Sequence, residues 1–153
     1  MKTVLALGCY DLLHVGHLNY LKEARKLVFK SGSDAQLIVG VASDEVVRRD
    51  KGKPPIIKQD DRVAMLNALS FVDAVYVYQR LSFVGLLDKI DPSVLAVGEH
   101  WGNEDRHKDA EEWMAHRNRE VIKIPYYEGE STTAIRQRVI DEYKAREQRM
   151  LEP

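Results

Sequence analysis

The fold is decided by residues 3–17, which read TVLALGCYDLLHVGH. The first five of these residues form a short apolar run, the pattern of a strand that is buried on both faces. A glycine-containing loop follows at Gly8, and helical spacing begins at His17 and continues to residue 29. A buried strand that leads through a short loop into a helix predicts the first unit of an α/β fold.

The same alternation continues along the whole chain. Apolar runs rich in Val, Ile and Leu cover residues 3–7, 37–42, 74–78, 94–97 and 121–124. Segments with helical spacing cover residues 17–29, 44–49, 60–69, 83–90, 109–118 and 133–148. Such alternation implies right-handed crossovers and places ligands beyond the carboxyl ends of the strands. We therefore predict a single Rossmann-like α/β domain over residues 1–153, doubly wound around a five-stranded parallel sheet.

The composition excludes several classes of protein. The 153 residues include 23 Lys and Arg against 24 Asp and Glu, and this balance argues against a strongly basic nucleic-acid binder. Apolar stretches such as 37–42 are far shorter than the roughly 20 residues of a membrane span. Cys9 is the only cysteine, so an internal disulfide and a CxxC site are excluded. The first residues lack the pattern of a signal peptide, and we expect a cytoplasmic protein.

Three long loops are predicted, at residues 30–36, 50–58 and 98–108. The first contains Ser-Gly-Ser-Asp and is typical of an ordinary surface turn. The second carries three lysines and two prolines. Loops of this length within a compact domain are often functional, so we expect the second and third to contribute to a site.

The loop between the first strand and the first helix has the features of an anion-binding site. Gly8 and Gly16 leave room for a phosphate or ribose to approach the backbone. His14 and His17 lie at the start of a helix, where free N–H groups and the helix dipole attract anions. Purely structural histidines are one alternative. Zinc bound by Cys9 and the two histidines is another, but their spacing lacks the regularity of a helical metal pair.

Four segments, in the same order, resemble the cytidylyltransferase-like nucleotidyltransferases, whose first signature is HxGH. They are GCYDLLHVGHLNYLKEAR, VGVASDEVVRRDKGKPP, DDRVAMLNALSFVDAVY and EGESTTAIRQRV. The resemblance implies transfer of a nucleotidyl group from a nucleoside triphosphate to a phosphorylated acceptor, with release of pyrophosphate. It also implies Mg²⁺, carried mainly by the nucleotide with no protein ligand named, and a homodimer.

The resemblance assigns catalytic roles to four positions. His14 and His17 would bind phosphates and stabilise the transition state, and Lys51, or Lys53 in its place, would close over the triphosphate or the acceptor. Arg62 would hold a phosphate oxygen through its planar fork. The alternatives are that Arg62 pairs with a neighbouring aspartate and that the lysines are ordinary loop charges.

The nucleotide would contact both ends of the chain. Ser131, Thr132 and Thr133 would hold the β and γ phosphates, although these residues are also typical of a simple helix cap. The remaining residues expected at the nucleotide are Gly8, Cys9, Tyr10, Gly16, Gly98, Glu99 and Trp101. Asp11 is expected to bond backbone N–H groups and hold the loop in shape.

The base and the acceptor are read from two short motifs. Gly98-Glu99-His100-Trp101 resembles the GDDW of glycerol-3-phosphate cytidylyltransferases, with Trp101 as a stacking or lid residue, so CTP and glycerol 3-phosphate are favoured. Tyr126 stands where those enzymes have an arginine, and a residue of 106–108 could replace that cation.

Three other readings remain open. They are an adenylyltransferase acting on a sugar phosphate or FMN, a cytidylyltransferase for an amino-alcohol phosphate or a phosphonate, and a nucleotide-binding module without turnover.

The three residues that could supply the cation absent at Tyr126 are Arg106, His107 and Lys108.

Overall fold

The computed structural model describes residues 1–30 and 34–152. The strands are β1 Lys2–Gly8, β2 Ala35–Ala42, β3 Ala74–Tyr78, β4 Val94–Gly98 and β5 Glu120–Ile124. The helices are α1 Val15–Lys30, α2 Asp44–Lys51, α3 Gln59–Asn67, α4 Val84–Ile90, α5 Asp105–Ala115 and α6 Thr132–Leu151. The predicted alternation of strand and helix is confirmed, while residues 31–33 of the turn expected at 30–36 lie outside the described residues.

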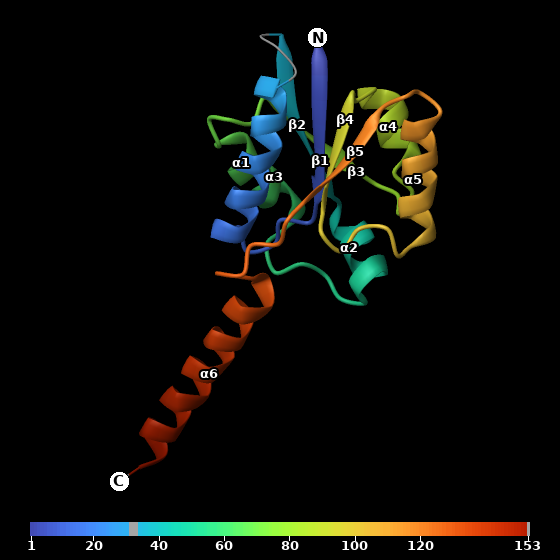
Figure 1. The fold of residues 1–153 in the computed structure, drawn as a ribbon. Coiled ribbons are helices and arrows are strands. Elements are labelled where there is room, and N and C mark those ends of the chain that lie inside the picture. Colours follow the sequence, from blue (N-terminus) through green and yellow to red (C-terminus); the bar gives the residue numbers. More distant parts are fainter. Residues whose placement is uncertain (31–33, 153) are drawn as a thin grey trace.

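The five strands form one parallel sheet in the order β3-β2-β1-β4-β5. The chain builds outward from β1 to β3 and then returns to the other side of β1 with β4 (Figure 1). Because all strands run the same way, their carboxyl ends meet at one edge of the sheet. The reversal beside β1 makes this edge the place where an open α/β sheet binds ligands.

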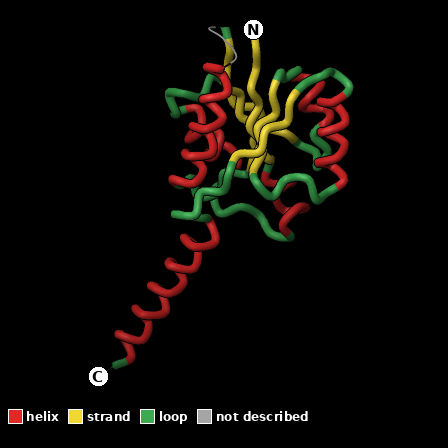
Figure 2. The backbone as a smooth tube through the Cα atoms, viewed as in Figure 1, coloured by secondary structure: helices red, strands yellow, loops and turns green. Residues whose placement is uncertain are grey.

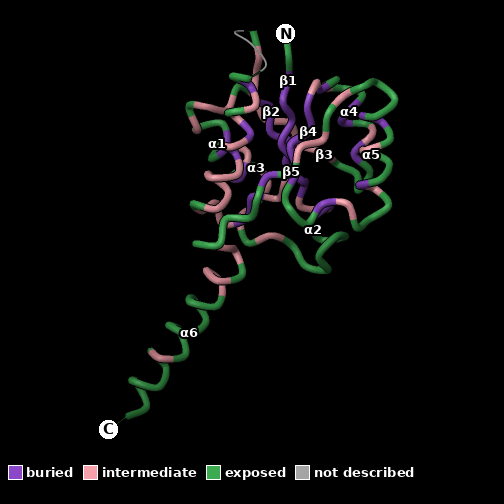
Figure 3. The backbone as a smooth tube through the Cα atoms, in the orientation of Figure 1, coloured by how far each residue is buried: buried purple, intermediate pink, exposed green. Residues whose placement is uncertain are grey.

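Helices cover both faces of the sheet, with α1 and α3 on one side and α4 and α5 on the other (Figures 1 and 2). Alternate residues of each strand face the two layers: Val4 packs in the core under α1 and α3, and Leu5 packs in the core under α4 and α5. Both residues are at most 1% exposed. Burial of both faces explains the almost continuous apolar runs of the central strands (Figure 3).

The helix ends differ from the prediction by up to four residues, and two of these differences shorten the long loops at the binding edge. Helix α2 continues to Lys51 and ends at Gly52, whose positive φ of 72° lets its N–H bond the carbonyl of Arg48. Helix α5 begins at Asp105 rather than at residue 109. Its first turn is held by tertiary packing, because the ring of His107 is buried and stacks on Trp101 with ring centroids 4.0 Å apart.

Helix α6 starts at the binding edge of the sheet and extends away from the other helices (Figures 1 and 3). None of its residues is buried, so only its first turns are held by the rest of the chain. Among the described helices, none combines the length and the apolar composition needed to cross a membrane.

Candidate functional site

A pocket of about 340 Å³ opens at the carboxyl edge of the sheet. Its walls are the end of β1, the start of α1, the ends of β4 and β5, and the start of α6. The pocket brings together most of the predicted site residues: Gly8, Cys9, Tyr10, His14, Gly16, His17, Lys51, Gly98, Glu99, Ser131 and Thr132. Lys51 lines it rather than Lys53, because α2 continues far enough to carry Lys51 to the edge.

The two histidines form a stacked pair, with ring centroids 3.8 Å apart and ring planes 26° from parallel. The N–H of Gly16 donates to Nδ1 of His14 at 3.0 Å, and the N–H of His14 lies 3.3 Å from Nδ1 of His17, to which it donates. A ring nitrogen that accepts a hydrogen bond carries no proton, so the proton of each neutral ring is on Nε2. These backbone contacts therefore leave Nε2–H as the hydrogen-bond donor of each histidine.

Gly16 is required by the position of this pair. A Cβ at this residue would lie 2.8 Å from Cε1 of His14 and 3.1 Å from the carbonyl oxygen of Glu130. Atoms that close must move apart, and the backbone of Glu130 is less free to move than a side chain. The glycine thus allows the imidazole of His14 to lie flat against the start of α1.

Both histidines are neutral near pH 7. Burial is the main cause that lowers the pKa of His17 to about 4, and repulsion by Lys51 and by a protonated His14 contributes to this value against the opposing effect of Asp11. Burial also lowers the pKa of His14, against the opposing effect of Glu130. Desolvation disfavours the charged imidazolium, so each ring offers a hydrogen-bond donor without carrying a full charge.

The start of α6 is joined to the histidine pair by hydrogen bonds. Thr132 donates its hydroxyl proton to the carbonyl of Asp11 at 3.1 Å, and its oxygen lies 3.3 Å from Nε2 of His14, from which it accepts. Ser131 caps the helix by accepting the N–H of Ala134 at 3.0 Å. The cap is therefore confirmed, and it places a helix N-terminus, with its free N–H groups, against the pocket. Thr133 does not line the pocket.

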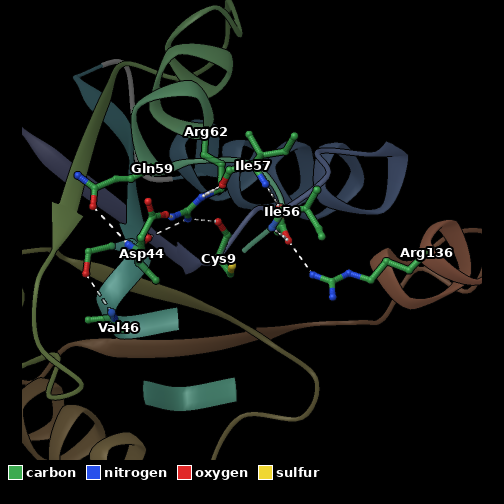
Figure 4. Close-up of polar contacts among 11 residues, drawn as sticks. Cys9, Asp44, Val46, Ile56, Ile57, Gln59, Arg62 and Arg136 are labelled. Atoms are coloured by element: carbon green, nitrogen blue, oxygen red, sulfur yellow. Dashed lines mark hydrogen bonds and ion pairs between the residues drawn. The ribbon is translucent and has the colours of Figure 1, made fainter. Parts of the chain in front are cut away.

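Asp11 bonds backbone N–H groups, as predicted, but those of a distant loop, and it also contacts α6. Its carboxylate accepts the N–H groups of Ile56 and Ile57, each at 2.8 Å, and pairs with Arg136 of α6 at 2.9 Å (Figure 4). Burial alone would raise the pKa of Asp11, but these three donors lower it below its ordinary value. The buried carboxylate thus fixes the loop before α3 and the first turns of α6 around the pocket.

Arg62 does not occupy the place predicted for it. It is 1% exposed, and its guanidinium donates to the carbonyls of Ile57, Cys9 and Ala42 at 3.0, 2.6 and 2.8 Å (Figure 4). It also pairs with Asp44 at 2.8 Å. In this structure the guanidinium is occupied by protein groups and does not line the larger pocket, so the predicted phosphate contact would require Arg62 to leave these partners. Arg62 instead holds the end of β2 and the residue after β1 together by donating to the carbonyls of Ala42 and Cys9.

Trp101 also lies outside the larger pocket, where it was expected to contact the nucleotide. Its indole is 9% exposed, donates to Glu111 at 3.0 Å and stacks on His107. It borders a second, smaller pocket rather than the one that contains Glu99. Glu99 itself accepts the N–H of Tyr126 at 3.0 Å. The tryptophan therefore cannot stack on a base in the larger pocket without leaving its hydrophobic packing.

Sequence reasoning missed several lining residues of the larger pocket: Tyr20, Ile124, Pro125, Tyr127 and Glu130. Tyr20 bonds the carbonyls of Leu7 and Ala96 at 3.2 and 2.8 Å, and so holds β1 and β4 together under the pocket. The position of Pro125 and Tyr127 just beyond β5 was a usable signal, because the carboxyl end of every strand meets at this edge.

The three residues considered as substitutes for the absent arginine do not line the larger pocket. His107 is buried against Trp101, and Lys108 lies 3.5 Å from Asp105 on the surface. Arg106 borders the second pocket, where it pairs with Asp50 at 2.8 Å.

Within residues 1–30 and 34–152, no three His, Cys, Asp or Glu side chains gather as a metal site. The acidic groups of the larger pocket have protein partners instead. Glu130, for example, pairs with Arg138 and accepts the N–H of Ser131. The donor set therefore does not fit a metal ion held by the protein alone.

Comparison with known proteins adds to this geometry. The family model described as cytidylyltransferase-like matches residues 5–138. An FAD synthase of Thermococcus kodakarensis is 38% identical over 92% of this chain and 93% of its own length. An FAD synthase of Methanopyrus kandleri is 38% identical over 97% of this chain and 99% of its own length.

Two further matches have different coverage. The bifunctional protein HldE of Campylobacter concisus is 39% identical over 92% of this chain, but the chain spans only 27% of that relative's length. A crystal structure of a lipopolysaccharide core biosynthesis protein from Thermoplasma volcanium superposes with a TM-score of 0.66 and 28% identity. It covers 84% of this chain and 99% of its own.

Proposed function

This chain belongs to the cytidylyltransferase-like family of nucleotidyltransferases, and we propose that it transfers an adenylyl group from ATP to the phosphate of a small acceptor. One observation carries the proposal: the stacked donors His14 and His17 lie in one pocket with Lys51 and with the start of α6. These are the groups needed to bind a triphosphate and to stabilise charge on it as it reacts.

The reaction forms one bond and breaks one. A phosphate oxygen of the acceptor attacks the α-phosphorus of the nucleotide, and the bond from that phosphorus to the bridging oxygen breaks. Pyrophosphate leaves with the electron pair. Because the attacking oxygen is already anionic, no general base is required, and catalysis comes from positioning and from charge stabilisation.

The residues of the pocket suit this task. The Nε2–H of His17 donates a hydrogen bond to a phosphate oxygen whose negative charge grows during the transfer, and the Nε2–H of His14, which bonds Thr132 in this structure, does the same once a phosphate oxygen replaces that hydroxyl. Lys51 adds a positive charge at the mouth of the pocket. The N-termini of α1 and α6 contribute free N–H groups and the positive ends of two helix dipoles.

ATP is proposed in place of CTP for two reasons. FAD synthases, whose product contains adenine, are similar to this chain over nearly their whole length. In addition, the motif that favoured CTP depended on Trp101, and this residue does not line the pocket of Glu99.

Mg²⁺ and the homodimer stay proposals. The ion would arrive on the triphosphate, whose charge it partly neutralises and whose oxygens it orients, and no step is assigned to a protein-bound metal. The exposed apolar side chains of α6, Val139, Ile140 and Tyr143, support an interface with a second copy. Sedimentation equilibrium tests it: a mass of twice 17.6 kDa is expected, and a monomer at micromolar concentration would contradict it.

The proposal is tested by pyrophosphate release. ATP and CTP are compared with Mg²⁺ against FMN, sugar phosphates, glycerol 3-phosphate, phosphoethanolamine and a phosphonate. We expect release with ATP and an acceptor that exceeds release with CTP at least tenfold. Release with CTP alone, or no release with any pair, would contradict adenylyl transfer.

A further inference from the structure

Glu130 places a negative charge in a pocket that is otherwise suited to anions. It lines the larger pocket together with His14, His17 and Lys51, the groups that would bind the triphosphate. Like charges repel more strongly in a partly enclosed pocket than in bulk water, so a carboxylate at this position opposes the binding of phosphates. It weakens their binding unless it moves away.

The carboxylate of Glu130 occupies the start of α6. One of its oxygens accepts the N–H of Ser131, the N-cap residue, at 2.9 Å, and its two oxygens contact the guanidinium of Arg138 at 3.3 and 2.6 Å. The N-terminus of a helix binds anions through its free N–H groups and its dipole. Glu130 thus takes, from within the chain, an N–H donor and a cation that a phosphate oxygen of a ligand would also bind.

These contacts hold the side chain in place only weakly. The side chain of Glu130 is 18% exposed and that of Arg138 is 62% exposed, and ion pairs that are open to solvent contribute little. Asp11, another carboxylate of the pocket, is 4% exposed and has three donors. The two acidic groups therefore differ, because an incoming phosphate can displace the carboxylate of Glu130 far more easily than that of Asp11.

The backbone of Glu130 is fixed, whereas its side chain can turn. Its carbonyl oxygen lies 3.1 Å from the point where a Cβ of Gly16 would be, so the chain packs closely against the start of α1. The charge of Glu130 also reaches the histidine pair, since it opposes the lowering of the pKa of His14 by burial. Rotation about side-chain bonds can move this charge toward solvent without any shift of the backbone.

A purely structural role for Glu130 makes the opposite prediction. Acidic side chains near the N-terminus of a helix stabilise it through the helix dipole. In that role Glu130 would only hold the first turn of α6 in place for the ligand. Its removal would then loosen that turn and weaken the binding of phosphates, whereas removal of a competing charge strengthens their binding. The sign of the change in affinity separates the two roles.

We propose that Glu130 sets the affinity of the site for phosphates by competing with them: its carboxylate holds the N–H of Ser131 and the guanidinium of Arg138 until a triphosphate displaces it, and it returns as pyrophosphate leaves. The proposal rests on the proposed nucleotidyl transfer and concerns the control of the same pocket. Competition of this kind raises the Kd of the triphosphate and the Kd of pyrophosphate together. Product release limits the turnover of many enzymes, and the returning carboxylate speeds it by taking the contacts that pyrophosphate gives up.

Calorimetry in the presence of Mg²⁺ tests the competition without turnover. The protein is titrated with α,β-methylene-ATP, in which the bond that would break is replaced, and separately with pyrophosphate. Glu130→Gln removes the charge but keeps the shape of the side chain and an oxygen that can accept the N–H of Ser131. We expect the Kd of both ligands to fall about threefold or more, the effect of removing one charge at a helix terminus. Glu130→Ala, which also removes the hydrogen bond, is expected to shift both constants in the same direction.

Glu128→Gln is the matched control. It changes the net charge by the same amount in the same loop, and Glu128 is exposed with no hydrogen bond or ion pair among the described residues. Its Kd values should stay within about 1.5-fold of those of the parent. Unchanged or weaker binding by Glu130→Gln, or an equal gain in Glu128→Gln, would overturn the competition and leave the nucleotide pocket in place. A parent and variants that bind neither ligand would instead overturn the proposed function, and this inference with it.

Discussion

His14 and His17 stack with ring centroids 3.8 Å apart, and each Nδ1 accepts a backbone N–H from the turn that carries the pair. Two imidazoles this close would repel each other if both were charged, and burial disfavours the charge on either. The arrangement therefore provides two neutral donors whose direction is set by the backbone.

His17→Ala is predicted to lower kcat by about 10²–10³, the usual effect of removing one donor to a developing charge. The KM for ATP should change much less, and the melting temperature should stay close to that of the parent. Steady-state kinetics and thermal unfolding measure these quantities. His116→Ala is the control, because His116 is exposed at the end of α5. A kcat of His17→Ala within threefold of the parent would refute the donor role.

Gly16→Ala is predicted to reduce kcat by at least tenfold while the protein still folds. The added Cβ would lie 2.8 Å from Cε1 of His14, so the ring must leave its place in the stack. Gly85→Ala is the control, since a Cβ at Gly85, in α4, meets no described atom within 4 Å. That substitution should leave kcat unchanged and raise stability by about 0.5–1 kcal/mol. Equal kinetics for both variants would show that the position of His14 does not matter.

The stability of the protein is predicted to fall between pH 6.5 and pH 4. His17 has a folded-state pKa of about 4 against an ordinary value of 6.5, so the unfolded chain binds the extra proton in this window. The contribution is fully present above pH 6.5 and is lost as the pH falls toward 4, to the extent of about 3 kcal/mol. Urea unfolding at several pH values measures it. His17→Asn should flatten this part of the profile, and an unchanged slope would contradict the lowered pKa.

Arg62→Lys is predicted to lower the free energy of unfolding by about 2–4 kcal/mol, because a lysine cannot reach all four groups that the guanidinium bonds. Urea unfolding again gives the measurement, with the exposed Arg80→Lys as the control. Were Arg62 a phosphate ligand, the substitution would raise the KM for ATP and leave stability nearly unchanged. A raised KM for ATP with nearly unchanged stability would support the phosphate contact of Arg62 that the sequence predicts.

The sheet, its helices and most of the larger pocket could be predicted from the sequence, because these depend on local pattern. Buried strands show as apolar runs, and the carboxyl ends of parallel strands must share one edge. The Ser131 cap followed in the same way, from what a short polar side chain does beside free N–H groups. Asp11 was also expected to bond such groups, but the ones it bonds lie 45 and 46 residues away and were not identified.

The errors share one physical cause, which is tertiary contact. The partners of Arg62 include Cys9 and Ala42, 53 and 20 residues away, and no local pattern shows that a charged side chain will be enclosed by them. Trp101 is drawn into the core by His107 and Glu111, whose own helix begins earlier than its polar sequence indicates. The end of α2, in contrast, had a usable local signal in Gly52.

The most direct test of the central claim follows the α-phosphate itself. The protein is incubated with ATP or CTP labelled with ³²P at the α-position, together with Mg²⁺ and the acceptors named above, and the products are separated and identified by mass spectrometry. The account predicts that label from ATP moves into an adenylylated acceptor joined through a new pyrophosphate linkage, with one unlabelled pyrophosphate released for each product. Label that moves only from CTP, or that appears only as free AMP or ADP, would contradict it.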